Sequence, residues 1–418
     1  MHGDGRGVLA EALVSWLSLY GVASAFQVYW NQTTRSRLER CIMFLLECLG
    51  ALLFVRGFFW ISGIKFFGIL TYVVAAVIPL AILLYVEALL RRHFALWAKT
   101  FVLAGTAFFL ALALWGNLHA HPLWLPVFTS YILAMQLVLS GAIVFHDRAD
   151  FAPIEGRAVA AIAVAVVLIV PFVATDLAAD LGLHMARVGS VGILIFVHAI
   201  VVASEPRSNA PRLLVANLAV IAIAALLGAI QSYVIGDVRP ATVARSAAMF
   251  ACIILLVMIH SRVHAYGQIA RGPGLVRSIA AADTRTTESF LRVLDRLPMV
   301  AAYRLLRARD LSAYEFWSFP GVFRARSEKV ITCNQLRRSP RARASNASAG
   351  SGDAIYHAEQ LEDLMEREAM THAVLIQESP VTLLLVQIPS AGMEQAAIAQ
   401  LGLVRTVAEA IERSNSHA

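Results

Sequence analysis

The stretch IKFFGILTYVVAAVIPLAILLYVEALL, residues 64–90, decides the fold class of the chain. It carries only two charged side chains, Lys65 and Glu87, one near each end. Because an α-helix needs about 20 apolar residues to cross the hydrocarbon core of a bilayer, this stretch predicts a membrane-spanning helix. Pro79 lies inside it, and membrane helices tolerate proline because neighbouring groups satisfy the freed backbone carbonyl.

Eight further apolar runs have a similar character, so the sequence predicts about nine transmembrane helices. The seventh run is the weakest, because its strictly apolar part, residues 188–203, is short, and eight helices is the alternative count. Pro171 lies inside the sixth run and is read as a second tolerated kink. The nine predicted helices cover residues 8–30, 38–60, 64–90, 96–116, 123–145, 158–178, 183–203, 213–235 and 241–260.

The composition differs sharply between two parts of the chain. Of all residues, 59% are hydrophobic and only 15% are charged, whereas soluble domains carry about 25% charged residues. The charges are sparse as far as Ser261 and become ordinary after Arg262. We therefore predict a polytopic α-helical membrane protein with a C-terminal cytoplasmic α+β domain. Its parts are a transmembrane domain at 1–264, a connecting amphipathic helix at 265–298 and the soluble domain at 299–418.

Positive charges in the short loops predict the orientation. Loops that follow odd-numbered helices contain more arginine and lysine than the others, which places them in the cytoplasm. The N-terminus is then outside and the C-terminus inside, as an odd number of helices requires. The net charge of +7 is explained by these loops and the C-terminal part, so no nucleic acid partner is expected. The richness in alanine and arginine is typical of a GC-rich bacterium, which favours the bacterial inner membrane.

After Arg262 the hydrophobic spacing predicts a small domain of helices and strands. Glu378, Ser379 and Pro380 separate two apolar runs and indicate a hairpin. Serine, alanine, glycine and arginine dominate residues 337–352, which favours a disordered loop. The predicted helices are 275–297, 356–369 and 393–414, and the predicted strands are 299–306, 329–333, 373–377 and 381–388.

Two segments of the soluble part resemble a GAF-type, and less closely a PAS-type, sensory domain. They are FLRVLDRLPMVAAYRLL, residues 290–306, and HAVLIQESPVTLLLVQIPSAGMEQAAIAQLGLVRTVAEAIERS, residues 372–414. The resemblance implies a pocket for a small molecule or a protein, and a homodimer formed through the first and last helices of the domain. Residues 337–352 stand where such domains have their middle strands. The membrane half resembles the multi-pass input regions of bacterial sensor proteins, and no kinase or cyclase module follows.

Polar side chains inside the apolar runs are the first candidates for a site, because each costs roughly 2.5–3.5 kcal/mol when charged at the bilayer centre. Glu47 lies near the middle of the second predicted helix, Gln136 midway along the fifth and His198 in the seventh. A ligand-binding or ion-binding role is one interpretation, and structural hydrogen bonding is the other. Glu11 and Arg56, toward the outer ends of neighbouring helices, are a candidate ion pair.

Histidines give weaker candidates, for a metal site. His260 and His264 are four residues apart on one helix face, and His119 and His121 lie in an outer loop. Two ligands do not make a metal site, and interfacial anchoring explains the first pair equally well. The four cysteines form no CxxC motif, and no phosphate-binding loop, zinc-protease motif or nucleophile elbow occurs. The cofactor therefore stays unknown, and an enzyme is the less favoured reading.

Three functions remain open. The first is a membrane-bound sensory or regulatory protein that relays a signal from the membrane helices to a cytoplasmic ligand-binding or partner-binding domain. The second is a transporter or membrane enzyme acting on envelope or lipid-linked substrates. The third is a scaffold or assembly subunit within a larger membrane complex. Fold alone does not decide among them, and the lipid bilayer is the one partner common to all three.

Overall fold

The structure is a computed structural model of the 418-residue chain. It describes residues 5–30, 37–115, 118, 123–147, 151, 153–180, 185–204, 210–270, 278–297, 300–325, 329–333, 335–336, 352–388 and 394–416. The chain forms two compact units. The first, called the helical unit, comprises 1–147, 157–203 and 208–266, and the second, called the sheet unit, comprises 148–156, 204–207 and 267–418.

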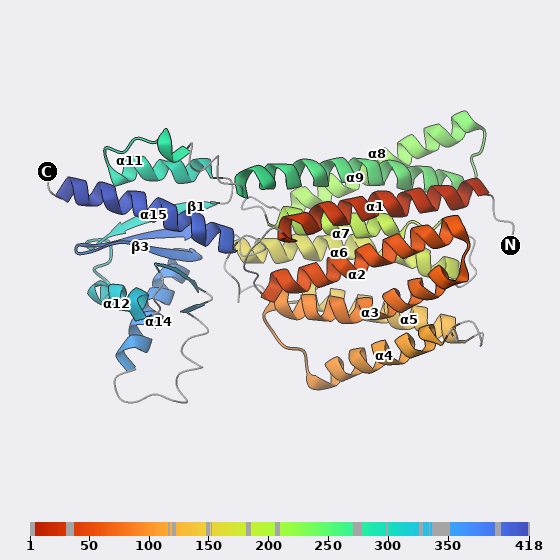
Figure 1. Cartoon of the computed structure of the whole chain (residues 1–418), viewed down its shortest axis with the longest axis horizontal. Coiled ribbons are helices and arrows are strands. Elements are labelled where there is room, and N and C mark those ends of the chain that lie inside the picture. Colours follow the sequence, from red (N-terminus) through yellow and green to blue (C-terminus); the bar gives the residue numbers. More distant parts are fainter. Residues whose placement is uncertain are drawn as a thin grey trace. The chain divides into compact units, whose positions relative to one another are not determined.

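The helical unit consists of long apolar helices, and eight of them are long and apolar enough to cross a membrane. The helix α7, which corresponds to the seventh predicted run, has 15 residues and is about 22 Å long, short of a hydrocarbon core of about 30 Å. Nearly all of its residues are buried, so it is enclosed by its neighbours. The helices (Figure 1) are α1 (Gly5–Trp30), α2 (Arg37–Ser62), α3 (Lys65–Leu90), α4 (Leu96–Leu114), α5 (Trp124–Val144), α6 (Pro153–Asp180), α7 (Gly189–Ala203), α8 (Ala210–Ile235) and α9 (Pro240–Ala270).

These bounds agree with the predicted apolar runs to within a few residues at most ends. Pro79 and Pro171 lie inside α3 and α6, as expected. The helix α2 packs against both α1 and α3, and α3 also packs against α4 and α5. This packing brings α2, α3 and α5 together, and it creates the site described below.

The sheet unit has one four-stranded antiparallel sheet with the order β1-β4-β3-β2. The hairpin predicted around Glu378, Ser379 and Pro380 joins β3 to β4, and the closing helix is present as α15. The strands are β1 (Ala302–Arg307), β2 (Val330–Thr332), β3 (His372–Glu378) and β4 (Val381–Gln387); the helices are α11 (Thr287–Leu291), η2 (Arg292–Arg296), η3 (Phe316–Ser318), α12 (Phe319–Ala325), α14 (Gly352–Arg367) and α15 (Glu394–Ser416).

Both faces of this sheet are covered (Figure 1). Successive strand residues point to opposite faces, so Val374 and Leu384 join the core formed with α11, η2 and α15. Ala373 and Leu383 join a second core formed with α12 and α14. Because β3 and β4 are buried on both sides, their sequences are almost continuously apolar.

The prediction of one continuous helix over residues 275–297 is wrong. The continuous helix over 275–297 is interrupted, since residues 281–286 form turns and bends before α11 begins at Thr287. Ile279 and Phe290 nevertheless pack on the same core, so the apolar spacing was sound although two segments supply it. The disordered loop predicted at 337–352 lies outside the described residues, except that α14 begins at Gly352.

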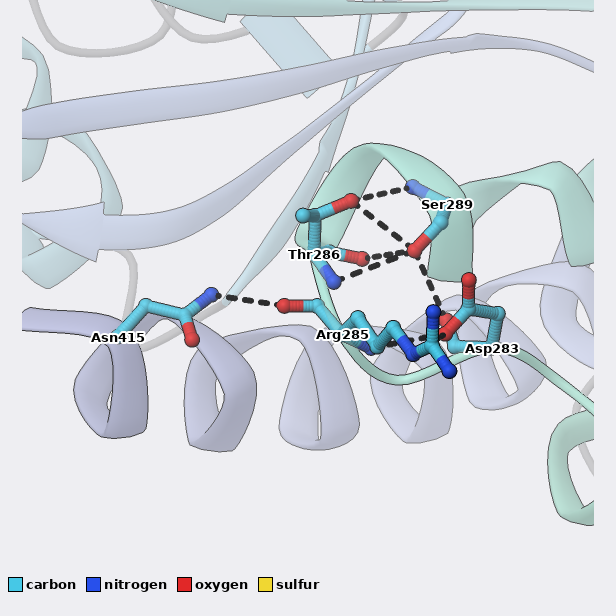
Figure 2. A network of polar contacts seen from close by, with 5 residues as sticks. All are labelled: Asp283, Arg285, Thr286, Ser289 and Asn415. Atoms are coloured by element: carbon cyan, nitrogen blue, oxygen red, sulfur yellow. Dashed lines mark hydrogen bonds and ion pairs between the residues drawn. The ribbon is translucent and has the colours of Figure 1, made fainter. Parts of the chain in front are cut away.

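Local hydrogen bonds explain the interruption. The Thr286 hydroxyl accepts from the Ser289 backbone N–H at 3.1 Å, and Ser289 Oγ accepts from the Thr286 N–H at 3.2 Å, which forms a capping box. Asp283 Oδ1 accepts from the Arg285 N–H at 3.1 Å. Asn415, near the end of α15, donates to the Arg285 carbonyl at 3.3 Å, so the turn is tied to the closing helix (Figure 2).

Candidate functional site

The helical unit contains a cavity of about 220 Å³ between α2, α3, α5, α6 and α7. Its wall is mainly aliphatic and aromatic, with a few polar side chains. Its lining includes Arg56, Trp60, Gly68, Ala75, Tyr85, Val86, Gln136, Ser140, Asp176, Arg187, Gly189 and Phe196.

The cavity is long and narrow. Gly68, near the start of α3, and Val86, near its end, both line it, and a helix rises 1.5 Å per residue, so the cavity extends about 27 Å along α3. That length is close to the thickness of a hydrocarbon core, about 30 Å. A volume of about 220 Å³ spread over this length gives a small mean cross-section.

Charged side chains gather at one end of the cavity, which we call the polar end: Arg56, Asp176 and Arg187. The Arg56 guanidinium donates to Asp176 Oδ2 and lies over the Trp60 ring, 4.3 Å from its centroid. Such stacking adds a cation–π attraction to the ion pair. The polar end therefore lies where α2 ends, α6 ends and α7 begins.

Asp176 also positions the start of α7. Its Oδ1 accepts from the Gly189 backbone N–H at 3.1 Å, and Thr175 Oγ1 accepts from the Val188 N–H at 3.3 Å. A Cβ atom at Gly189 would lie 2.2 Å from Asp176 Oδ2, so any larger residue there would have to displace the carboxylate from its present position. Both carboxylate oxygens of Asp176 are thus engaged by groups of the protein.

Further along the cavity the polar groups are neutral. Gln136 Nε2 donates to Ser140 Oγ at 3.4 Å, one helical turn away on α5. The Tyr85 ring packs edge-on against Phe196 with centroids 5.8 Å apart. Its hydroxyl is buried and has no hydrogen-bond partner among the described residues. A hydroxyl of this kind can still donate a hydrogen bond to a bound molecule or water.

The three sequence candidates for a ligand or ion site are separated in the structure. Gln136 lines the cavity. Glu47 lies on the exposed face of α2, between the buried Leu46 and Cys48. His198 is buried in α7 but does not line the cavity.

His198 instead joins α7 to α8. Its Nδ1 lies 3.1 Å from Asn217 Oδ1, and because a carbonyl oxygen only accepts, Nδ1 is assigned as the donor. His198 Nε2 and Asn217 Nδ2 are buried with no hydrogen-bond partner in the described part of the chain. The pair fits the structural reading of His198, a polar contact between helices.

The structure gives Glu11 and Arg56 different partners. Glu11 Oε1 accepts from Arg245 Nε at 3.1 Å and so joins α1 to α9, while Arg56 pairs with Asp176. Sequence reasoning did not single out Asp176 or Arg187. Asp176 stands near a predicted helix end, where acidic residues are common, and only the fold brings it to Arg56.

The histidine candidates do not form a metal site in the described residues. His260 and His264 are exposed, with ring centroids 6.3 Å apart, and no third donor from the described residues joins them. His119 and His121 lie outside the described residues. In the sheet unit, ligand atoms of Cys333, Glu362 and Glu366 lie within 4.8 Å of one another.

Comparison with known proteins adds no family to this description. No family model matches the chain, and searches of curated proteins and of solved structures find no match.

Proposed function

We propose that this chain is a membrane-bound sensory protein that binds an amphiphilic molecule inside its helical unit and relays its occupancy to the sheet unit. The observation that carries the proposal is the cavity, which is long, narrow, apolar along most of its wall and charged at one end. Ligand sites in proteins are typically apolar clefts with a few polar groups that fix the orientation of the ligand. An amphiphile matches both parts of this wall.

In this proposal the sheet unit passes the signal on to a partner. Packed side chains cover both faces of its sheet, with cores against α11 and α15 on one side and against α12 and α14 on the other. The GAF-type resemblance supports a binding role for this unit toward a partner or a second copy. A ligand shifts an equilibrium only by binding two states unequally, so occupancy of the cavity must favour one arrangement of α6 and α7 over another.

The proposed placement counts the short, enclosed α7 as a ninth crossing, and it has the N-terminus outside, the C-terminus in the cytoplasm and the chain in a bacterial inner membrane. In this orientation the polar end lies at the outer surface. A tag fused after Ala418 should then resist protease added to intact cells and be cleaved after lysis. Cleavage in intact cells would contradict the orientation.

The experiment uses the full chain and a pair of matched variants. Ala75 lines the cavity, and Ala104 lies on the exposed face of α4. Protein purified in mild detergent is denatured, and the amphiphiles that it releases are identified by mass spectrometry. We expect the wild type and Ala104→Phe to release a bound amphiphile, and Ala75→Phe to release at least ten-fold less.

Relay to the sheet unit is tested on the same proteins. Each is compared as purified and after washing into phosphatidylcholine nanodiscs, with amide hydrogen exchange measured in α11 and α15. We expect washing to change exchange in the wild type and in Ala104→Phe, and to leave Ala75→Phe unchanged. A wild type that loses its amphiphile without any change in the sheet unit would contradict the sensory proposal.

The same cavity supports a second candidate function, a transporter or membrane enzyme for lipid-linked substrates. The specific observation is the pair of arginines at the polar end, since guanidinium groups bind phosphate well. Full-length protein in proteoliposomes would then move a fluorescent lysophosphatidylglycerol between leaflets, and Arg187→Gln would stop this movement. Leaflet exchange equal to that of protein-free liposomes would exclude it.

A further inference from the structure

We propose that the cytoplasmic ends of α2, α3 and α4 form a binding site for the phosphate head group of an anionic phospholipid in the inner leaflet. There α2 and α4 begin and α3 ends, so three segments meet at one end of the helical unit. We call this region, residues 37–40 and 87–103, the basic end. The inference rests only on the membrane placement in the proposed function, because it uses neither the cavity nor the sheet unit.

A buried carboxylate gathers the charges of the basic end. The side chain of Glu87 is 4% exposed, and Lys99 Nζ lies 2.6 Å from its Oε1. The same oxygen accepts from the Phe94 backbone N–H at 2.8 Å, while a guanidinium nitrogen of Arg37 lies 3.6 Å from Oε2. Glu87 thereby fixes the turn between α3 and α4 and brings the first turns of α2 and α4 together, so their cations share one surface.

The cations of the basic end keep hydrogen-bond donors for another anion. The Arg37 guanidinium lies beyond hydrogen-bond distance of Glu87, and its side chain is half exposed. Lys99 Nζ has three donors, and its contacts are Glu87 and, at 3.3 Å, His93 Nδ1. Arg40 is exposed, close to Arg37 on the next turn of α2, and forms no ion pair with any described residue. An anion can therefore bind without breaking the contacts of Glu87.

The charge of the basic end is positive whichever of its residues pair. Three cations stand against two carboxylates and leave a net charge of +1: Arg37, Arg40 and Lys99 against Glu39 and Glu87. Arg91 and Arg92, in the turn after α3, raise it to +3. Both have contacts within the protein, and the surplus does not depend on them. Basic surfaces at the cytoplasmic ends of membrane helices attract the phosphates of anionic lipids.

Apolar side chains beside the cations favour a lipid over a free phosphate. Leu96 and Leu103 stand at helical spacing on the same face of α4 as Lys99, and they are 79% and 57% exposed. Trp97 is 76% exposed in the first turn of α4, and tryptophan prefers the level of the lipid head groups. A phospholipid whose phosphate meets Lys99 can thus lay its acyl chains along α4.

The experiment is a lipid titration of the full chain in detergent, followed by native mass spectrometry. Phosphatidylglycerol and phosphatidylcholine with the same acyl chains are added in parallel, so the two titrations differ in the charge of the head group. The test variant combines Arg37→Gln and Arg40→Gln. The matched control combines Arg212→Gln and Arg239→Gln, which removes two exposed positive charges elsewhere on the helical unit.

We expect the first phosphatidylglycerol to bind the wild type at least five-fold more tightly than phosphatidylcholine. The control variant should keep this preference, and the test variant should lose most of it. Lys99→Gln should weaken it as well, although this change also alters the contacts of Glu87. Glycerol 1-phosphate at millimolar concentration should not displace the lipid, because it lacks the acyl chains that meet Leu96 and Leu103.

The contrary results are distinct. Equal binding of the two lipids by the wild type would overturn the site, and so would an equal loss of preference in the test and control variants, which would show attraction by net charge alone. Displacement by glycerol 1-phosphate would overturn the lipid as occupant and indicate a free phosphate. Failure of the proposed membrane placement is seen separately, as a chain that stays dispersed without detergent.

Discussion

The two units of this chain place their apolar and polar side chains in opposite ways. In the helical unit, large apolar side chains such as Leu226 and Tyr233 are exposed, while the ion pair of Arg56 and Asp176 is mostly enclosed. In the described part of the sheet unit, only Trp317, Tyr356 and Leu403 are large apolar side chains that lie exposed. If the helical unit lies in a membrane, as we propose, the difference teaches that one rule, burial of the groups that the surroundings solvate poorly, gives opposite patterns in lipid and in water.

Ion pairs provide the strongest test of this contrast. Asp176→Asn leaves Arg56 without its carboxylate in an enclosed site, and breaking a buried pair costs about 3–5 kcal/mol. Glu378→Gln breaks the exposed pair with Arg324 in the sheet unit, where the expected loss is below about 1 kcal/mol. Unfolding of both variants in the same nanodiscs measures the difference. Equal losses would show that the two sites have similar solvation.

Leucine truncation is the second test. Leu384 is fully buried in β4, so Leu384→Ala should destabilise the sheet unit by about 2–5 kcal/mol through lost burial and a cavity. Leu226→Ala changes an exposed position on α8, where the side chain meets lipid on our account. Its unfolding free energy should change by less than about 1 kcal/mol. A large loss at Leu226 would indicate that another protein covers this face.

The pH dependence of the stability of the sheet unit provides the third test. His372 is buried, its Nδ1 lies 2.8 Å from Thr371 Oγ1, and burial lowers its pKa from 6.5 to about 4. Between these values the unfolded state binds a proton that the folded state does not, so stability falls as pH falls. The expected loss between pH 7 and pH 4 is about 3 kcal/mol.

Denaturant unfolding of the sheet unit, followed by a probe specific to it, measures this loss at each pH. The variant His372→Gln should remove most of the slope between pH 6.5 and pH 4. A slope that is unchanged in the variant would place its origin in other groups.

The smallest expected effect concerns Glu47. Its carboxyl group lies on the exposed face near the middle of α2, where a charged side chain costs roughly 2.5–3.5 kcal/mol in lipid. Because this side chain would meet lipid in the folded and in the unfolded membrane state alike, most of the cost cancels, and Glu47→Leu should leave stability unchanged or raise it by about 1 kcal/mol. Glu359→Leu on the exposed face of α14 should mainly lower solubility. A destabilised Glu47→Leu would instead reveal a partner that contacts the carboxyl group.

The sequence predicted the features that depend on local residue patterns, such as the long helices and the hairpin. The lengths of the apolar runs predicted the long helices. The run that ends at Ala203 is short, so it was the weakest candidate for a membrane-spanning helix, and it corresponds to α7 with its 15 residues. The apolar runs on either side of Ser379 and Pro380 gave the hairpin of β3 and β4. A polar side chain at mid-helix pointed to Gln136, which does line the cavity.

What the sequence did not predict depends on contacts between distant residues or on competing local bonds. Arg56 and Asp176 are 120 positions apart and meet only through the packing of α2 near α6. Helical spacing over 275–297 concealed a turn, because the Thr286 and Ser289 side chains satisfy the backbone there without a helix. The cavity itself is a product of five helices, and no single helix carries its signature.

The most direct measurement is a pair of cryo-electron microscopy maps of the full chain, one as purified in mild detergent and one after washing into phosphatidylcholine nanodiscs. The account predicts elongated density inside the cavity along α3 in the protein as purified, and weaker density there after washing. Helices that close over the cavity, or density confined to the outer surface of the bundle, would contradict it.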